Sequence, residues 1–429
     1  MNSLLITDTY LPRIGGRENY YHHLFNRFEE GEVVVVTPDQ TGDCGRFDRE
    51  SKLPIFRINR ANRTWFIDGR RARARWLWRL RSLCRRHQID VVHCGVILPD
   101  GLSGWFLSRT LGKPYIAYAF GKEILENQQD PRLAKRMDIA FSAASRVVSI
   151  SRYTTEMVKA SGVPSDKIVQ IPPGVDARRF ASGVSSERAD ALRQAYGLSS
   201  KVVILTVGRL VERKGVDRVM ESLPRLLERF PEAAYLVVGE GPDRRRLERL
   251  RDSLGLEKQV IFTGLVSQED LLACYELATL FVMVSRQPTD SCEIEGFGIV
   301  YLEANAAGLP VVAGASGGAV DAVVDGRTGF LVDPVDPDAI AGAILRLLED
   351  PELRRRLGSF GRERATESFS WERMAGRLER LTGEVGAAQT TRSPFGATTQ
   401  ALPLLLQRDL FGAARGDRAT VGRAQGVRE

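Results

Sequence analysis

Short, uninterrupted runs of valine, isoleucine and leucine recur along the chain, and segments with helical spacing of apolar residues lie between them. Strands that are apolar on both faces are typical of parallel sheets covered by helices on either side. We expect strands over 4–7, 33–36, 91–94, 115–119, 147–150, 168–171, 202–207, 235–238, 260–263, 280–284 and 310–313. The pattern therefore predicts an α/β chain with parallel sheets.

These runs fall into two groups that are separated near residues 176–200, and Pro172, Pro173 and Gly174 indicate a stiff crossing just before that stretch. We predict two doubly wound, Rossmann-like domains, residues 1–180 and 181–370. Ligands of such sheets bind beyond the carboxyl ends of the strands, so facing domains would share a central cleft. We expect a terminal helix over 371–386 that crosses back to the first domain, followed by a loosely ordered tail over 387–429.

Composition narrows the class of function. The chain has 429 residues and no apolar run approaching the 18 that a membrane span needs, and its first residues lack a signal-peptide pattern. Five scattered cysteines and four histidines form no metal-ligand motif, which favours a reduced cytoplasmic protein without a metal site. There is no Walker loop, nor a glycine-rich dinucleotide fingerprint followed by an acidic residue, so hydride-transfer chemistry is disfavoured.

The net charge of +7 is concentrated in residues 70–86, which contain eight arginines, no acidic residue and apolar side chains at helical spacing. One interpretation is a basic amphipathic helix that docks onto an anionic membrane, on its inner face for a cytoplasmic protein. The other is a core-packed helix whose charged face is simply solvated. Nucleic acid is a weaker idea, because no recognised binding motif accompanies the arginines.

The segment from Glu295 to Glu303 holds two carboxylates around a Gly-Phe-Gly triplet. A helix that begins near Gly298 would expose free backbone N–H groups, which suit a phosphate or a sugar hydroxyl. Glu303 lies further along that helix and would need hydroxyl partners, because a carboxylate repels phosphate. An extended sugar nucleotide could reach both ends. A surface helix with two solvated glutamates is the plain alternative.

Four further loops, each at the end of an expected strand, agree with a nucleotide-sugar ligand. The first has a glycine pair suited to phosphate, and the second has an arginine and a lysine that can grip a diphosphate. The other two bring the backbone close to a ligand. Their residues are Gly15 and Gly16, then Gly208, Arg209 and Lys214, then Gly241, then Gly264 and Val266. Tight turns and solvated charges are the alternatives.

In these motifs and their order, the chain resembles the retaining glycosyltransferases of family 4, which have the two-domain GT-B fold. The similarity covers roughly residues 1–384 and is most specific in Glu295-Gly-Phe-Gly-x4-Glu303, Gly308-Leu-Pro-Val-Val312 and Gly317-Gly318-x-x-Asp321. The sequence Gly298-Ile-Val-Tyr-Leu-Glu-Ala304 is most similar to that of the phosphatidylinositol-mannosyltransferase-like branch.

The resemblance implies transfer of a hexose from a GDP- or UDP-linked donor to a glycan or lipid acceptor in cell-envelope glycan synthesis, with retained anomeric configuration and neither metal nor cofactor. Its catalytic residues would be Arg209 and Lys214, on the donor diphosphate, and Glu295, on the transferred sugar. Glu303 would bind the ribose. Backbone groups of Phe297, Gly298 and Ile299 would complete the donor site, with Gly16 approaching from the first domain.

One position departs from the family pattern. The usual His-Gly-x-Glu motif on the acceptor side is here Phe120-Gly121-Lys122-Glu123, and phenylalanine can neither accept a proton nor hydrogen-bond a sugar. Lys122 or Glu123 could substitute, or the acceptor geometry could differ. A non-catalytic nucleotide-sugar or glycan-binding homologue is therefore an alternative, and a nucleotide-sugar epimerase is a less favoured one. The nucleobase, sugar, acceptor and oligomeric state are left open.

Overall fold

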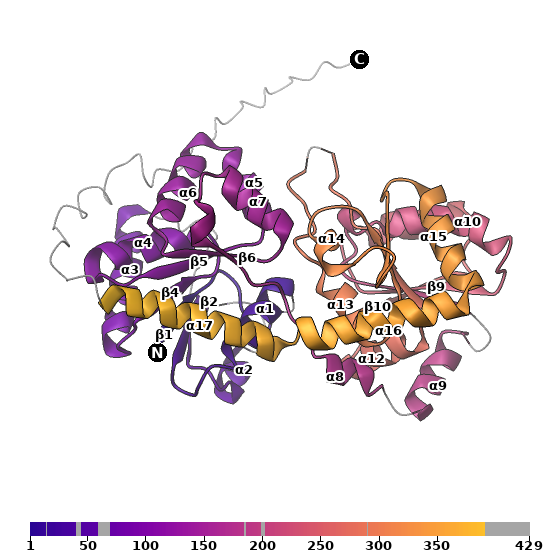
Figure 1. The fold of residues 1–429 in the computed structure, drawn as a ribbon, viewed down its shortest axis with the longest axis horizontal. Coiled ribbons are helices and arrows are strands. Elements are labelled where there is room, and N and C mark those ends of the chain that lie inside the picture. The colour runs from indigo at the N-terminus through magenta and orange to yellow at the C-terminus, as the bar shows by residue number, and fades with distance from the viewer. Residues whose placement is uncertain are drawn as a thin grey trace, which may run out of the picture.

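A computed structural model describes residues 1–13, 15–39, 44–58, 69–183, 186–198, 202–289 and 291–390. Within these ranges the chain forms two lobes, each built on one parallel sheet with helices on both faces (Figure 1). The predicted pair of Rossmann-like parallel sheets is confirmed. None of the helices in the described ranges is long and apolar enough to cross a membrane.

The first sheet has seven strands in the order β3-β2-β1-β4-β5-β6-β7. Its register is set by pairs such as Leu5 with Val35 on one side and Leu5 with His93 on the other. The strands are β1 (Ser3–Ile6), β2 (Val33–Pro38), β3 (Ile55–Ile58), β4 (Val91–Cys94), β5 (Tyr115–Ala119), β6 (Arg146–Ser149) and β7 (Ile168–Gln170). The helices around it are α1 (Gly16–Phe25), α2 (Cys44–Glu50), α3 (Gly69–Arg86), α4 (Asp100–Leu111), α5 (Lys122–Gln128), α6 (Pro131–Ala143) and α7 (Arg152–Ala160).

The second sheet has six strands in the order β10-β9-β8-β11-β12-β13. They are β8 (Val202–Val207), β9 (Ala233–Val238), β10 (Val260–Gly264), β11 (Leu280–Met283), β12 (Val311–Gly314) and β13 (Gly329–Val332). The helices are α8 (Ala177–Ala181), α9 (Ser186–Ala195), α10 (Val216–Leu227), α11 (Arg244–Ser253), α12 (Gln268–Leu277), α13 (Ile299–Ala306), α14 (Ala319–Ala322), α15 (Pro337–Glu349) and α16 (Pro351–Ser368).

The chain crosses between the lobes twice, and the two crossings lie side by side. The Val175 N–H donates to the Phe369 carbonyl at 2.7 Å. A side chain at Gly174 would come within 2.8 Å of the Trp371 ring, so only glycine allows this approach. Beyond the second crossing, α17 (Trp371–Thr390) packs against α1 and β4 of the first lobe (Figure 1).

The stretch 176–200, near which the two groups of expected strands separate, contains α8 and α9, which pack on α13 and α12 of the second lobe. Helix α17 runs to Thr390, four residues beyond the expected end of the terminal helix. The remainder of the expected tail, 391–429, lies outside the described residues.

The core explains why the apolar runs were informative. Strand residues such as Leu5, Val35, Val237 and Phe281 are almost completely buried. The cluster that contains Leu5 and Val35 continues into the second lobe, so the two lobes share one apolar core around the crossings and α17. Such continuity holds the strand ends of the two sheets in a defined relation.

Candidate functional site

The second sheet reverses its strand order between β8 and β11, and this is the place where open α/β sheets bind ligands. Beyond β8 lies the loop with Arg209, Arg213 and Lys214, and beyond β11 lie Ser285 and Arg286. The two loops are far apart in sequence but adjacent in space, since β8 and β11 are hydrogen-bonded neighbours.

A buried carboxylate lies at the centre of this junction. Glu295 Oε2 accepts hydrogen bonds from Lys214 Nζ at 2.6 Å, Arg213 Nη1 at 2.8 Å and Ser285 Oγ at 3.1 Å. Glu295 and Lys214 are each 8% exposed. Burial would raise the pKa of Glu295, but Lys214 and Arg213 outweigh it and lower the pKa to about 2. Glu295 is therefore ionised throughout the physiological range.

Gly215 holds the lysine-bearing loop in place. Its φ of +72° lies in the left-handed region, and a Cβ there would be 2.2 Å from the Val284 carbonyl oxygen. Arg286 N–H also donates to the Arg213 carbonyl at 2.8 Å. The backbone after β11 is thus locked against the turn that presents Lys214.

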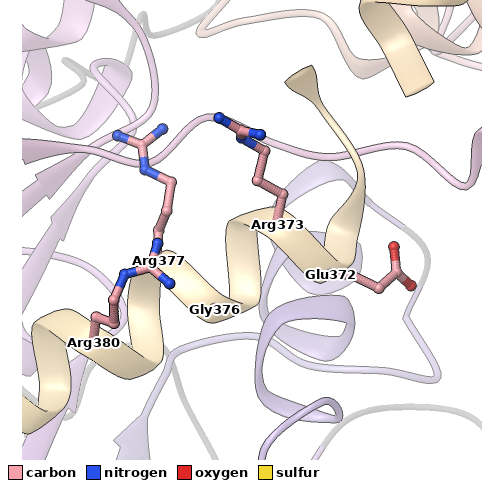
Figure 2. Close-up of a pocket in the computed structure, with 5 residues that line it drawn as sticks. All are labelled: Glu372, Arg373, Gly376, Arg377 and Arg380. Carbon is pink, nitrogen blue, oxygen red and sulfur yellow. The ribbon is translucent and has the colours of Figure 1, made fainter. Parts of the chain in front are cut away.

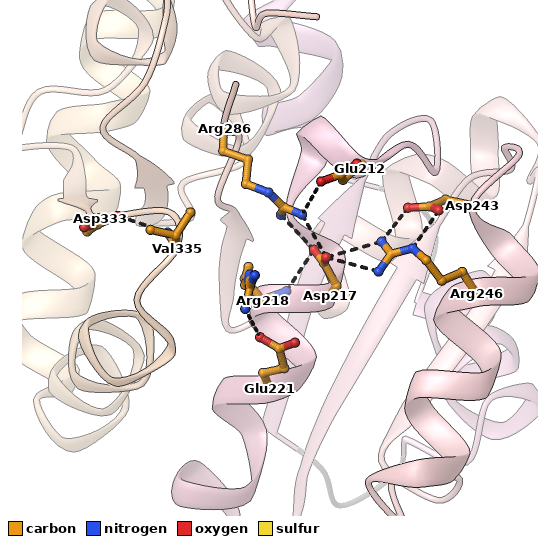
Figure 3. Close-up of polar contacts among 9 residues, drawn as sticks. All are labelled: Glu212, Asp217, Arg218, Glu221, Asp243, Arg246, Arg286, Asp333 and Val335. Atoms are coloured by element: carbon orange, nitrogen blue, oxygen red, sulfur yellow. Dashed lines mark hydrogen bonds and ion pairs between the residues drawn. The ribbon is translucent and has the colours of Figure 1, made fainter. Parts of the chain in front are cut away.

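An ion-pair network supports the same loop from beneath (Figure 3). Arg286 donates from both terminal nitrogens to Asp217, at 2.8 Å each, and both side chains are nearly inaccessible to solvent. Arg246 reaches Asp217 at 3.2 Å and also pairs with Asp243. Asp217 lies three residues after Lys214, so the network fixes the start of α10 relative to β11.

Helix α13 begins at Ile299, with Gly298 as its N-cap at φ +87°. The predicted placement of Gly296 and Gly298 before a helix N-terminus agrees with this geometry. Glu303 lies within α13 and accepts a hydrogen bond from Tyr275 at 2.8 Å, and burial raises the pKa of its carboxyl. Within the described residues Glu303 and Glu295 have no hydrogen-bond partner in common, so the two carboxylates are held by separate groups.

The other candidate donor residues lie on neighbouring strand ends. Gly239 N–H donates to the Gly264 carbonyl at 2.9 Å, and a Cβ at Gly241 would be 2.2 Å from the Leu210 carbonyl oxygen. Gly208 follows β8 directly, Val266 is half-buried just beyond β10, and the Phe297 ring is buried. At Gly239 and Gly241 the neighbouring backbone is thus too close for a side chain.

Arg209 and Gly16 have free space around them, whereas a Cβ at Gly15 would be 2.3 Å from Glu18 Oε2. The Arg209 side chain is exposed and makes no hydrogen bond or ion pair within the described ranges. Gly15 caps α1 in an extended conformation, and an added Cβ at Gly16 would meet nothing within 4 Å. The structure therefore does not gather Arg209 into the Glu295 cluster, where Arg213 stands instead.

The acceptor-side loop meets the Glu295 segment across the two lobes. A Cβ at Gly296 would be 2.9 Å from the Phe120 carbonyl oxygen, and one at Gly121 would be 2.5 Å from Ile294. The Phe120 ring packs edge-on against Tyr20 and Tyr21, at centroid distances of 5.6 and 5.8 Å. Phe120 is therefore an apolar residue directly beside the Glu295 segment.

Glu123 folds back on its own loop. Its Oε1 accepts from the Phe120 N–H at 2.6 Å and the Gly121 N–H at 3.3 Å, and burial raises the pKa of the carboxyl. These bonds hold the turn into α5 in which Gly121 has a φ of +106°. The geometry favours a structural role for Glu123 over contact with an acceptor.

Sequence reasoning missed the residues that connect the lobes. Glu293 pairs with Arg213 at 3.2 Å and also with Lys122 of the first lobe. Arg152, at the start of α7, pairs with Asp321 of the second lobe through its backbone N–H and its side chain. Arg213 was detectable as the neighbour of Lys214, but Glu293 and Arg152 carry no local signal, since each acts through a distant partner.

Two parallel α/β lobes joined by paired crossings, with a basic, glycine-rich junction between them, are the arrangement of the GT-B fold. Family models match both parts: "Glycosyltransferase Family 4" over residues 14–179 and "Glycosyl transferases group 1" over residues 189–364. Anabaena HepE in complex with UDP shares the fold, with a TM-score of 0.76 at 20% identity, covering 90% of this chain and 100% of that one.

Curated relatives are more similar in sequence. The chain is 34% identical over 388 residues to a GDP-mannose-dependent alpha-(1-6)-phosphatidylinositol monomannoside mannosyltransferase of Mycolicibacterium smegmatis, covering 90% of this chain and 100% of the relative. The enzyme of the same description from Mycobacterium tuberculosis is 31% identical, with 87% and 96% covered. The chain belongs to glycosyltransferase family 4, in the phosphatidylinositol-mannosyltransferase-like branch.

Proposed function

We propose that this enzyme transfers mannose from GDP-mannose to a phosphatidylinositol-mannoside type of lipid. Its full-length similarity to relatives described in those terms carries the proposal. The Lys214–Glu295–Arg213 cluster at the strand-order reversal supports it, because a diphosphate and a hexose hydroxyl would both find partners there.

The site residues would divide the donor between them. Lys214 and the free guanidinium of Arg209 bind the diphosphate and stabilise the charge that develops as the glycosidic bond breaks. Glu295 accepts hydrogen bonds from hydroxyls of the transferred sugar, and Glu303 accepts them from the ribose. The N-terminus of α13, with Phe297, Gly298 and Ile299, adds backbone N–H groups, and Gly16 leaves room for the phosphates on the first-lobe side.

In the proposed reaction the bond from the sugar C1 to the phosphate oxygen breaks, and a bond from C1 to an acceptor hydroxyl oxygen forms. The acceptor proton leaves with the nucleoside diphosphate. We propose retention of anomeric configuration and a metal-independent reaction, as the family resemblance implies. The residues of the chain then contribute binding, orientation and electrostatic stabilisation rather than a covalent intermediate.

A matched set of variants tests this site. GDP release from GDP-mannose, with and without a phosphatidylinositol mannoside, should be fastest with the lipid present. Arg209→Ala and Lys214→Ala should each lower turnover by about 100-fold or more. Arg245→Ala, an exposed arginine of α11, is the control and should leave turnover unchanged. Equal rates in the Lys214 variant and the control would refute the site, and turnover with UDP-glucose alone would refute the donor.

We propose that the enzyme works in the cytoplasm at the membrane surface, with α3 as the docking element. Trp76, Leu80 and Cys84 pack into the core, while Trp78 is 56% exposed. The Arg81 guanidinium lies over the Trp78 ring, 5.3 Å from its centroid, and Arg79, Arg85 and Arg86 are exposed on the same helix. An aromatic ring among cations suits an anionic interface. Salt-sensitive sedimentation with anionic vesicles, reduced by Trp78→Ala, would support docking. The same sedimentation with neutral vesicles would oppose it.

Phe120 motivates a second candidate, a nucleotide-sugar-binding homologue without turnover. Its ring offers no hydrogen bond at the position where the family has histidine. Tight GDP-mannose binding with no transfer to any acceptor, together with activity gained by Phe120→His, would favour this candidate. Transfer by the unaltered chain would exclude it.

A further inference from the structure

A basic pocket lies on α17 immediately after the second crossing between the lobes (Figure 2). It has a volume of about 500 Å³ and is lined by Glu372, Arg373, Gly376, Arg377 and Arg380. Their spacing places the three arginines on one face of the helix, and Gly376 leaves space between them. The pocket shares no residue with the Lys214–Glu295 cluster.

The positive charge in this pocket is only partly offset by acidic neighbours, since Glu379 interacts electrostatically with Arg380 alone among the three arginines. Glu372 is committed elsewhere, because its carboxylate accepts from Arg27 at 2.9 and 3.1 Å and points away from the arginines (Figure 2). Within the described ranges, Arg373, Arg377 and Arg380 form no ion pair with any carboxylate. Burial, together with the like charges of Arg373 and Arg380, lowers the pKa of the Arg377 guanidinium.

Two of the arginines hold the two crossings. Arg377 Nη2 donates to the Gln170 carbonyl, at the end of β7 just before the first crossing, at 2.6 Å. Arg373 Nη1 reaches the Glu367 carbonyl, near the end of α16 just before the second crossing, at 3.5 Å. Each guanidinium has further donors, which a planar fork can direct at a phosphate.

We propose that this pocket is a binding site for a phosphate group, held between Arg373, Arg377 and Arg380. A dianionic phosphate supplies the acceptor oxygens and negative charge that the pocket lacks. A phosphate bound there contacts both Arg377, which holds the end of β7, and Arg373, which holds the end of α16. It therefore stabilises the two crossings relative to each other. A lipid headgroup phosphate and a soluble phosphate share this chemistry.

The test compares two double variants with equal loss of charge. Arg373→Gln with Arg380→Gln removes two pocket arginines and keeps the Arg377 bond to Gln170. Arg245→Gln with Arg249→Gln removes two exposed arginines one turn apart on α11. Pyrophosphate binding is measured by titration calorimetry, and sedimentation is measured with phosphatidylcholine vesicles with or without phosphatidic acid. Both variants keep the proposed donor site, so any binding there is common to both.

We expect the pocket variant to bind pyrophosphate about 10-fold more weakly than the α11 variant and the unaltered protein, or to bind one pyrophosphate fewer per chain. That result supports the site with a soluble anion. Equal pyrophosphate binding with sedimentation lost only by the pocket variant supports the site with a lipid phosphate. If the two double variants match in both measurements, the arginines are a solvated face and the proposal is wrong.

Discussion

Replacing Asp217 by asparagine should destabilise the second lobe by about 4 kcal/mol. The substitution keeps the size of the side chain but removes the charge that pairs with Arg286. Both partners of this ion pair are almost fully buried, with side-chain exposures of 6% and 7%. A buried charge that loses its partner still carries the cost of its desolvation. Removing one partner therefore lowers stability by more than the intact pair contributes to it.

The magnitude depends on what remains around the orphaned charge. Without Asp217, the nearest carboxylate to Arg286 is Glu212, at 3.5 Å and 58% exposed, which compensates weakly. In Arg286→Met, by contrast, Asp217 retains Arg246 at 3.2 Å. The expected cost is therefore smaller, at about 2 kcal/mol. Which of the two variants loses more stability is as informative as how much stability each loses.

Urea unfolding followed by far-UV circular dichroism gives the measurement, because both lobes contribute to that signal. Two lobes need not unfold in one step, so midpoints are compared transition by transition. Asp338→Asn is a matched control: its partner Arg225 lies 2.7 Å away, but the side chains are 80% and 55% exposed. The control should cost less than about 1 kcal/mol.

Three outcomes would refute this reasoning. Asp217→Asn could match the exposed control, or cost less than Arg286→Met, and either result would mean that solvent reaches the pair. The double variant Asp217→Leu with Arg286→Met should cost less than the sum of the two single changes, because neither charge is left alone. Full additivity would show that the two side chains do not act as a pair.

Three further predictions follow from single positions. Gly215→Ala should cost about 2 kcal/mol and lower turnover, since a Cβ at φ +72° would meet the Val284 carbonyl at 2.2 Å; thermal unfolding and GDP release measure both effects. Tyr275→Phe should raise the donor KM about 5-fold with kcat unchanged, because Glu303 loses its 2.8 Å partner; steady-state kinetics checks the split. Burial lowers the pKa of His93 to about 3 in the folded protein. As the pH falls, the imidazole is therefore protonated in the unfolded chain before it is protonated in the folded one, and stability falls as pH drops from 6.5 toward 3. Unfolding at pH 6.5 and 5 should differ by about 2 kcal/mol more in the unaltered protein than in His93→Gln.

The central strands could be predicted because a strand that is buried on both faces appears in the sequence as a nearly uninterrupted run of apolar residues. Val33–Pro38 and Val202–Val207 are apolar apart from one buried threonine each, Thr37 and Thr206, and both strands were expected. Strand β3 (Ile55–Ile58) was missed, since it lies at the sheet edge, is only half-buried and carries Arg57. Strand β13, at an edge of the second sheet, begins with a glycine and was also missed. Edge strands lose the two-sided burial on which the pattern depends.

The candidate site was predictable only where its residues are near in sequence. Glu295 and Gly298 share one segment, and Lys214 follows a recognisable strand. The bond between Lys214 and Glu295 was not visible, because it depends on β8 lying beside β11 in a sheet whose order differs from chain order. The same topology pairs Arg286 with Asp217. Phe120 was identified as a departure, but its packing on Tyr20 and Tyr21 requires the folded lobe.

The charges at the junction are suited to the proposed donor. Lys214, Arg213 and Lys122 face the carboxylates of Glu295, Glu293 and Glu126 through ion pairs, and Arg209 adds a free cation at the rim. Four cations against three carboxylates leave an excess of about one positive charge, which attracts the diphosphate of a nucleotide sugar. After the glycosidic bond breaks, the leaving diphosphate gains a further negative charge before it takes up the acceptor proton. The cations of the junction therefore attract the leaving group more strongly than they attract the donor. That difference, rather than tight donor binding, lowers the barrier.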